Sequence, residues 1–142
     1  MTGKVLDLAA LDTVQGSNAG FEVAIYSPAT NEDLGLFITV LGKDSDVFQK
    51  VSRSQQKKRI EKMNKGGFRN MNVPIESIEA DNIQLLAEAT KSWRQGDKQT
   101  ITVEGKELAC TSENAASLYE RFPWIKEQVD TAAGDRANFI RN

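Results

Sequence analysis

The sequence predicts a single α+β domain with two short antiparallel β-ribbons and about four helices. Two segments, 21–41 and 100–109, contain short runs in which apolar and polar residues alternate, as in strands with one buried face. Elsewhere apolar residues recur at helical spacing, in segments that begin with capping residues. A length of 142 residues is that of one ordinary domain, which is large enough to bury a hydrophobic core.

The first 19 residues are expected to form a partly ordered arm in front of a domain that spans 20–142. The apolar residues between 5 and 11 suffice for one or two helical turns, and so short a helix is marginal in an isolated chain. Residues 15–20 have the composition of a turn. Such an arm either frays in solution or packs against a neighbouring molecule.

A β-hairpin is expected near the N-terminus, over 21–41. Apolar and polar residues alternate from 21 to 26, which indicates a strand with one buried face. Turn-forming residues occupy 28–33, and a second strand, rich in β-branched residues, follows over 36–41.

Helical patterns and a second ribbon make up the rest of the chain. Helices are expected over 44–64, 74–93, 112–122 and 123–140, and the ribbon over 100–109, around Glu104-Gly105. Asp44 or Ser45 caps the first helix, and Thr111 or Ser112 caps the third. Trp93 closes the apolar face of the second helix, where a large side chain is typical of the core.

The composition excludes most enzyme chemistry. The chain has no histidine, which removes the commonest general base and the usual partner of a serine or cysteine nucleophile. Its one cysteine, Cys110, supplies neither a disulfide nor a thiolate metal site. The nearest carboxylate pairs, Glu104 with Glu107 and Glu32 with Asp33, fall in expected turns, where acids are usually exposed. We therefore expect a non-enzymatic protein with no catalytic residue, no metal and no cofactor.

The sequence predicts neither a transmembrane helix nor a secretory signal. The sequence contains no run of about 18 apolar residues, which a transmembrane helix requires. Its N-terminus lacks the basic and then apolar regions of a secretory signal. A single cysteine suits a reducing compartment, and a net charge of -2 predicts no general attraction to membranes or nucleic acid.

Charge is nevertheless divided unevenly along the chain. Residues 43–69 contain nine lysines and arginines against three acids, so this segment carries +6 and the remainder carries -8. The basic helix, with Lys57, Lys58 and Arg59 as candidate contacts, either meets phosphate or an acidic protein surface or is simply solvated, which is the commoner case. Nucleic acid is not the expected partner, because aromatic residues do not interleave with the basic ones.

A second candidate contact surface surrounds Pro123, where two apolar stripes meet. Its members are Leu118, Tyr119, Phe122, Trp124 and Ile125. Apolar residues of this kind belong to a core more often than to an interface, so both interpretations stay open at this stage.

The order of several short motifs is distinctive. They occur in this order: Gly20, residues 27–32 of the hairpin, residues 38–45, Trp93, the ribbon around Gly105, residues 111–115, Pro123, Gln128-Val129 and Asn138-Phe139. Taken together over about residues 5–141, they resemble tail assembly chaperones and related small tail proteins of long-tailed bacteriophages.

This resemblance implies a function in virion assembly. A tail assembly chaperone coats the tape measure protein and keeps it soluble in the bacterial host cytoplasm while the tail initiator is built. It is displaced as the major tail protein polymerises, so the major tail protein is a further candidate partner and the mature virion is expected to lack the chaperone. Such a protein is also expected to bind copies of itself.

Two other classes of function remain open. A structural component of the tail or the head–tail junction would stay in the finished particle. A nucleic-acid-binding regulator would use the basic segment 43–69 and would bind less tightly as salt increases.

Overall fold

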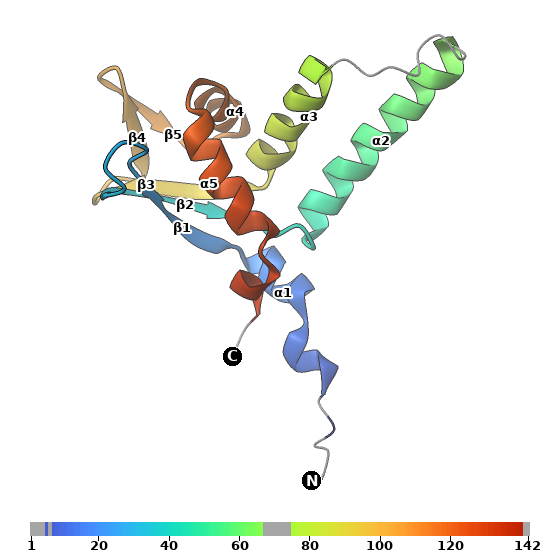
Figure 1. Ribbon diagram of the computed structural model, residues 1–142, viewed down its shortest axis with the longest axis horizontal. Helices are drawn as coiled ribbons and strands as arrows, with labels where there is room; N and C mark the ends of the chain where they lie inside the picture. The colour runs from blue at the N-terminus through green and yellow to red at the C-terminus, as the bar shows by residue number, and fades with distance from the viewer. Residues whose placement is uncertain (1–4, 6, 67–74, 141–142) are drawn as a thin grey trace.

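The computed structural model describes residues 5, 7–66 and 75–140, and it confirms the predicted α+β class (Figure 1). The strands are β1 (Phe21–Tyr26), β2 (Asp33–Val40), β3 (Thr90–Gln95), β4 (Thr100–Val103) and β5 (Lys106–Ala109). The α-helices are α1 (Thr13–Ala19), α2 (Asp46–Gly66), α3 (Ile75–Glu88), α4 (Ser112–Arg121) and α5 (Pro123–Gly134). Two 3-10 turns are η1 (Leu8–Leu11) and η3 (Arg136–Phe139).

Strands β1, β2 and β3 form an antiparallel sheet with β2 in the middle. The predicted hairpin of β1 and β2 is confirmed, although β2 begins earlier than expected, at Asp33. Across the sheet Val23 pairs with Ile38, which pairs with Trp93, and all three side chains are buried. Because side chains alternate along a strand, this register buries one face of the sheet and leaves the other more exposed.

Helices α3, α4 and α5 cover the buried face of the sheet, while α2 extends outward beside α3 (Figure 1). α5 packs on β1 and β2, and α4 packs on both α3 and α5. Ile25 and Val40 from the sheet, Leu86 from α3 and Val129 from α5 are among the most deeply buried side chains. Burial of such a side chain contributes about 1.5–3 kcal/mol, so these contacts hold the domain together.

Three local predictions agree with the structure. The Ser45 hydroxyl accepts the backbone N–H three residues later (3.1 Å), which makes Ser45 the cap of α2. The Thr111 hydroxyl does the same at the start of α4 (3.1 Å). Strands β4 and β5 form the predicted ribbon, and its two turn residues, Glu104 and Gly105, have φ of 51° and 77°, as a tight hairpin turn requires.

The predicted helix over 74–93 is wrong in its last part, because the chain forms β3 from Thr90 onward. Pro74 lies outside the described residues, and α3 ends at Glu88. The Thr90 hydroxyl donates to the carbonyl oxygen of Leu86 (2.9 Å) at this end, and the following residues pair with β2. Trp93 is therefore a buried strand residue. Its spacing from the α3 residues fits a helix equally well, and only pairing with β2 distinguishes the two.

The predicted final helix is also too long, since α5 ends at Gly134. The side chain of Asp135 then accepts the N–H of Ala137 (3.1 Å) and begins η3. This turn brings Phe139 into the protein, where its ring meets the ring of Phe21 edge-on, with centroids 6.1 Å apart. A glycine followed by an aspartate favours a helix end over a continued helix, which explains the break.

Residues 13–19, expected to belong to a partly ordered arm and to include a turn, instead form helix α1. This helix packs against η3 and the start of α2. Gly16 lies so close to η3 that a Cβ atom at this position would overlap the carbonyl oxygen of Phe139. Before α1, the side chains of Leu8 and Leu11 are exposed, so the packed part of the N-terminal segment begins at α1.

Asp44 connects α1, the approach to α2 and η3. Its carboxylate accepts two hydrogen bonds from the Arg136 guanidinium (2.8 and 3.0 Å) and one from the Thr13 hydroxyl (2.6 Å). These bonds, that from Arg136 first, lower the pKa of Asp44 from its ordinary value of 3.8 to about 2. The charged carboxylate is therefore the form that the folded protein stabilises.

We expect this cluster to make the stability of the protein depend on pH in acid. Because the pKa is lower in the folded protein, the contribution of Asp44 is complete above about pH 4 and is lost as the pH falls towards 2. Asp44→Asn is expected to lower the free energy of unfolding near neutral pH and to approach the wild type near pH 2. Urea unfolding across this range measures both curves, and a difference that stays constant with pH would contradict the prediction.

Candidate protein-binding surfaces

Three of the five apolar residues proposed as contacts around Pro123 lie in the core. Leu118, Tyr119 and Ile125 are 3%, 1% and 3% exposed. The apolar stripes of α4 and α5 meet each other and the sheet, so these three side chains do not form a binding surface in this fold. The prediction that they contact a partner is corrected accordingly.

Tyr119 has a structural role that its hydroxyl makes clear. The hydroxyl oxygens of Tyr119 and Thr90 lie 2.6 Å apart, which joins α4 to the start of β3. Burial raises the pKa of Tyr119 well above its usual range, so the phenol stays protonated.

Phe122 and Trp124 are the members of the proposed set that reach the surface. Both side chains are half-buried, and their rings pack edge-to-face with centroids 6.0 Å apart. The Arg121 guanidinium lies over the Phe122 ring, 5.4 Å from its centroid. Because both rings are half-buried and pack on each other and on Arg121, the pair exposes only a small patch of aromatic surface.

The three proposed basic contacts differ in their surroundings. Lys57 and Lys58 are exposed, whereas Arg59 is half-buried and pairs with Asp81 on α3 (2.9 Å). The Gln55 side-chain amide donates to the backbone carbonyl of Asp81 (2.8 Å), one turn away on the same side of α2. Arg59 and Gln55 therefore hold α2 against α3, and only the two lysines remain available to a partner.

The outward side of α2 carries a line of positive charge. Gln55 and Arg59 face α3, so residues roughly half a turn away point to the opposite side. Arg53 and Lys57 lie on this side, and Lys50, three residues before Arg53, lies at its edge, where it also lines a hollow between α2 and α3. We call these three residues the basic face. All three are exposed, and none forms an ion pair with any residue that the structure describes.

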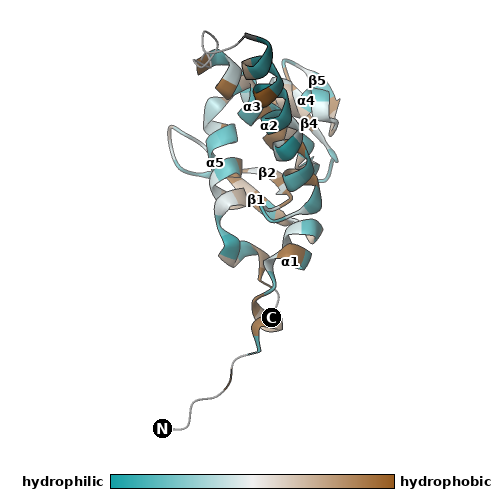
Figure 2. Cartoon of the chain, turned by 90° about the vertical axis from the view of Figure 1, so that its right-hand side faces the viewer, coloured by the Kyte–Doolittle hydropathy of each residue, from teal (hydrophilic) through white to brown (hydrophobic). Residues whose placement is uncertain are grey.

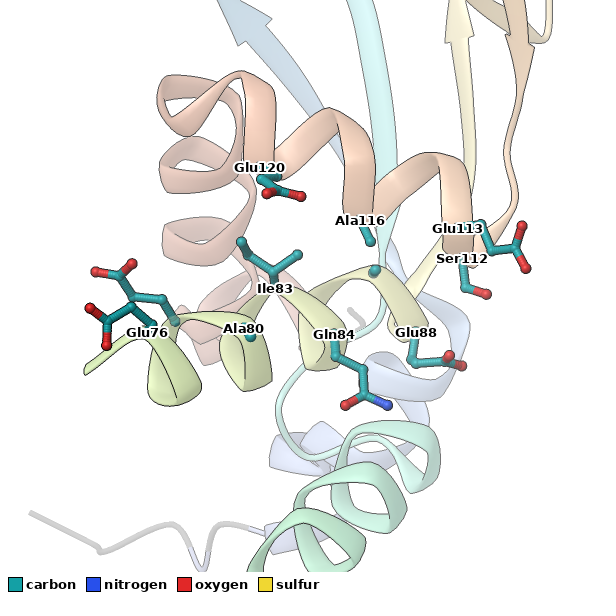
Figure 3. Close-up of a pocket in the computed structure, with 11 residues that line it drawn as sticks. Glu76, Ala80, Ile83, Gln84, Glu88, Ser112, Glu113, Ala116 and Glu120 are labelled. Carbon is teal, nitrogen blue, oxygen red and sulfur yellow. The ribbon is translucent and has the colours of Figure 1, made fainter. Parts of the chain in front are cut away.

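A groove of about 530 Å³ runs between α3 and α4 (Figure 3). Its floor is formed by small and apolar side chains, namely Ala80, Ile83, Ala87 and Ala116. Five glutamates line it: Glu76, Glu79, Glu88, Glu113 and Glu120. Figure 3 shows Glu76 at one end, Glu88 and Glu113 at the other, and Glu120 above Ile83. We call this feature the α3–α4 groove.

The negative charge of the α3–α4 groove is uncompensated within the described part of the chain. None of its five glutamates takes part in an ion pair there. Sequence reasoning missed this groove because its two walls come from helices that are separated by β3, β4 and β5. The local signal was the acidic and small residues of α3, where Glu76 and Glu79 precede Ala80 and Ala87.

A third surface is apolar. Four large side chains lie at the end of α2 and the beginning of α3: Ile60, Met63, Ile75 and Ile78, which are 57%, 38%, 70% and 40% exposed. These two helix ends lie at the same end of the α2–α3 pair (Figure 1), and both helices show hydrophobic turns near it (Figure 2). We call this surface the apolar tip.

The cysteine and the carboxylates considered as reactive groups take part in structural contacts. Burial raises the pKa of the half-buried Cys110 thiol to about 11, so the nucleophilic thiolate is scarce at neutral pH. Glu104 pairs with Arg121 (2.6 Å), which lowers its pKa, and Glu107 pairs with Lys98 (2.6 Å). Within the described ranges, no group of three or more Asp, Glu or Cys side chains is arranged to hold a metal ion. Among the described helices, none is long and apolar enough to cross a membrane.

No protein-family model, curated protein or solved structure matches this chain. The chemistry of the three surfaces, together with the resemblance in the motifs, therefore supports the functional argument.

Proposed function

We propose that this protein is a tail assembly chaperone of a long-tailed bacteriophage, and that it acts by binding, without catalysis. In this proposal it binds the tape measure protein and keeps it soluble in the host cytoplasm until the major tail protein polymerises. The order of the motifs supports the class, from residues 27–32 and 38–45 to Thr111-Ser112-Glu113-Asn114-Ala115 and the C-terminal positions.

The apolar tip is the observation that carries the proposal. Large apolar side chains exposed at the neighbouring ends of two helices of a small domain indicate a protein interaction surface. A helical client can bind such a surface through apolar residues repeated along one of its faces. Ile75 is the most exposed of the four side chains, so it has the most area left to bury.

One tip offers only a small contact area, and association costs several kcal/mol of lost rotational and translational freedom. A single copy is therefore expected to bind weakly. A long client that offers repeated sites can engage several copies, and this multivalency raises the overall affinity without new contacts.

Co-expression with the tape measure protein of the same phage tests the proposal. The wild-type chain is expected to keep the client in the soluble fraction and to co-purify with it in several copies. Ile75→Ser with Ile78→Ser is expected to reduce the co-purified client at least about tenfold, because both α3 members of the apolar tip are lost.

A matched control replaces two exposed apolar side chains far from the apolar tip. Tyr26→Ser with Leu34→Ser changes side chains that are 43% and 42% exposed on the hairpin, and client binding is expected to persist. A client that stays insoluble with the wild-type chain would contradict the chaperone proposal. Mass spectrometry of purified virions would then decide whether the protein is a structural component, since a chaperone is expected to be scarce there.

A further inference from the structure

Two surfaces of this chain are complementary to each other in charge and in shape. The α3–α4 groove has an apolar floor between glutamates, while the basic face of α2 presents Lys50, Arg53 and Lys57 in one line. Within one molecule α2 packs on α3 through Gln55 and Arg59. Arg53 and Lys57 point away from that contact, and Lys50 lines a separate hollow between α2 and α3, beside Gln84 and Glu88. None of the three lines the α3–α4 groove of its own chain.

Electrostatics favours a positively charged occupant of the α3–α4 groove. Carboxylates gathered around one groove repel one another, and an opposite charge removes that repulsion. Of the residues that line the groove, five are glutamates and none is a lysine or arginine. An acidic or neutral partner would leave these charges uncompensated.

The floor of the groove suits the side chains of the basic face. Lysine and arginine can lay their aliphatic stems along apolar surface while their charged ends reach the rim. Ala80, Ala87 and Ala116 are small, which lets a second helix backbone approach closely.

The lengths of the two surfaces also agree. The lining residues of α3 extend from Glu76 to Glu88, a rise of about 18 Å, and the basic face from Lys50 to Lys57 covers about 10 Å of α2, so it fits within the groove. One helix can therefore place all three basic side chains within the groove.

From this complementarity we propose that the protein self-associates, with the basic face of α2 from one copy seated in the α3–α4 groove of a second copy. The contact is heterologous, because the two copies use different surfaces. Such contacts either close into a ring or continue as an open chain of copies. The inference goes beyond client binding, and it is tested with the chain alone.

Light scattering after size-exclusion chromatography, over a range of protein and salt concentrations, measures the association. The wild-type chain is expected to exceed its monomer mass of 15.7 kDa at low salt and to dissociate as salt increases. The α2 variant, Lys50→Glu with Arg53→Glu and Lys57→Glu, is expected to associate at least about tenfold more weakly. This variant spares Gln55 and Arg59, the two side chains that bond α2 to α3.

A groove variant makes the reciprocal change. Glu79→Lys, Glu88→Lys and Glu120→Lys reverse the charge of the α3–α4 groove, and two of these positions end helices, where lysine is favoured by the helix dipole. This variant alone is also expected to be monomeric. If circular dichroism shows that it does not fold, the three glutamine substitutions replace it, with a smaller loss of association expected.

Mixing the two variants is the decisive experiment. The acidic α2 of the α2 variant is then complementary to the basic groove of the groove variant. The unchanged acidic groove of the α2 variant is likewise complementary to the unchanged basic α2 of the groove variant. The mixture is therefore expected to recover the wild-type mass at concentrations where each variant alone is mostly monomeric. A general effect of the substitutions on net charge or stability would not restore association on mixing, so recovery of the wild-type mass indicates this specific contact.

A control variant reverses two exposed lysines and one half-buried lysine elsewhere, Lys91→Glu, Lys106→Glu and Lys126→Glu, and is expected to associate like the wild type. The proposal is overturned if the wild-type chain is monomeric at every concentration and salt. It is equally overturned if the α2 variant associates as tightly as the wild type, or if the mixed variants stay apart. None of these outcomes depends on the tape measure protein, so a negative client-binding test would not change the result for self-association.

Discussion

Trp93→Ala is expected to lower the free energy of unfolding by about 3–5 kcal/mol, a large part of the stability of a domain this size. The Trp93 side chain is 3% exposed in the middle of the edge strand β3, opposite Ile38. Its indole N–H also donates to the carbonyl oxygen of Leu108 on β5 (3.0 Å). Truncation therefore opens a cavity in the core and removes the bond between the sheet and the ribbon.

Urea unfolding followed by circular dichroism measures this loss, and Trp93→Phe serves as the control. Phenylalanine keeps an aromatic ring in the core but cannot donate to Leu108, so a smaller loss of about 1–2 kcal/mol is expected. Equal, small effects of both substitutions would show that Trp93 does not support the core in this way. The second tryptophan, Trp124, remains in both variants as a fluorescent reporter of the α4–α5 region.

Gly16→Ala is expected to displace α1 from the domain, at a cost of about 2–3 kcal/mol or more. The new Cβ atom would overlap the backbone carbonyl of Phe139, and backbone cannot move aside as a flexible side chain can. Either α1 or η3 must shift, and the buried ring of Phe139 would lose part of its packing.

Limited proteolysis and hydrogen exchange measure this displacement, with faster cleavage or exchange expected in α1 than in the wild type. Gly134→Ala is the matched control, because its Cβ would lie 3.1 Å from the end of the flexible Lys43 side chain. This control is expected to keep the wild-type pattern and to change stability by less than about 1 kcal/mol. An undisturbed α1 in the Gly16→Ala protein would contradict the tight contact with η3.

Elements governed by local chemistry were predictable from the sequence. The hairpin of β1 and β2, the ribbon around Gly105 and the caps at Ser45 and Thr111 all depend on residues that are neighbours in the chain. Turn residues, alternation and capping hydroxyls act over only a few positions, so the pattern contains the physical cause.

The errors came from contacts between distant segments. Trp93 stands at a spacing that suits the face of α3, yet β2 supplies the hydrogen bonds that make it a strand residue. The apolar residues Leu118 and Ile125 were candidates for a partner surface, and the fold buries them against the sheet instead. A stripe of apolar residues is the same pattern whether its partner is the protein's own core or another molecule.

The sequence by itself determined the α+β class, the hairpin, the ribbon and the division of charge between the basic segment and the remainder. The tertiary structure decided where those charges lie: Arg59 became part of the contact between α2 and α3, while Lys50, Arg53 and Lys57 are exposed and form no ion pair with any described residue. It also created the α3–α4 groove. The physical reason is that secondary structure responds to nearby residues, whereas a groove needs two helices that only the packed core holds together.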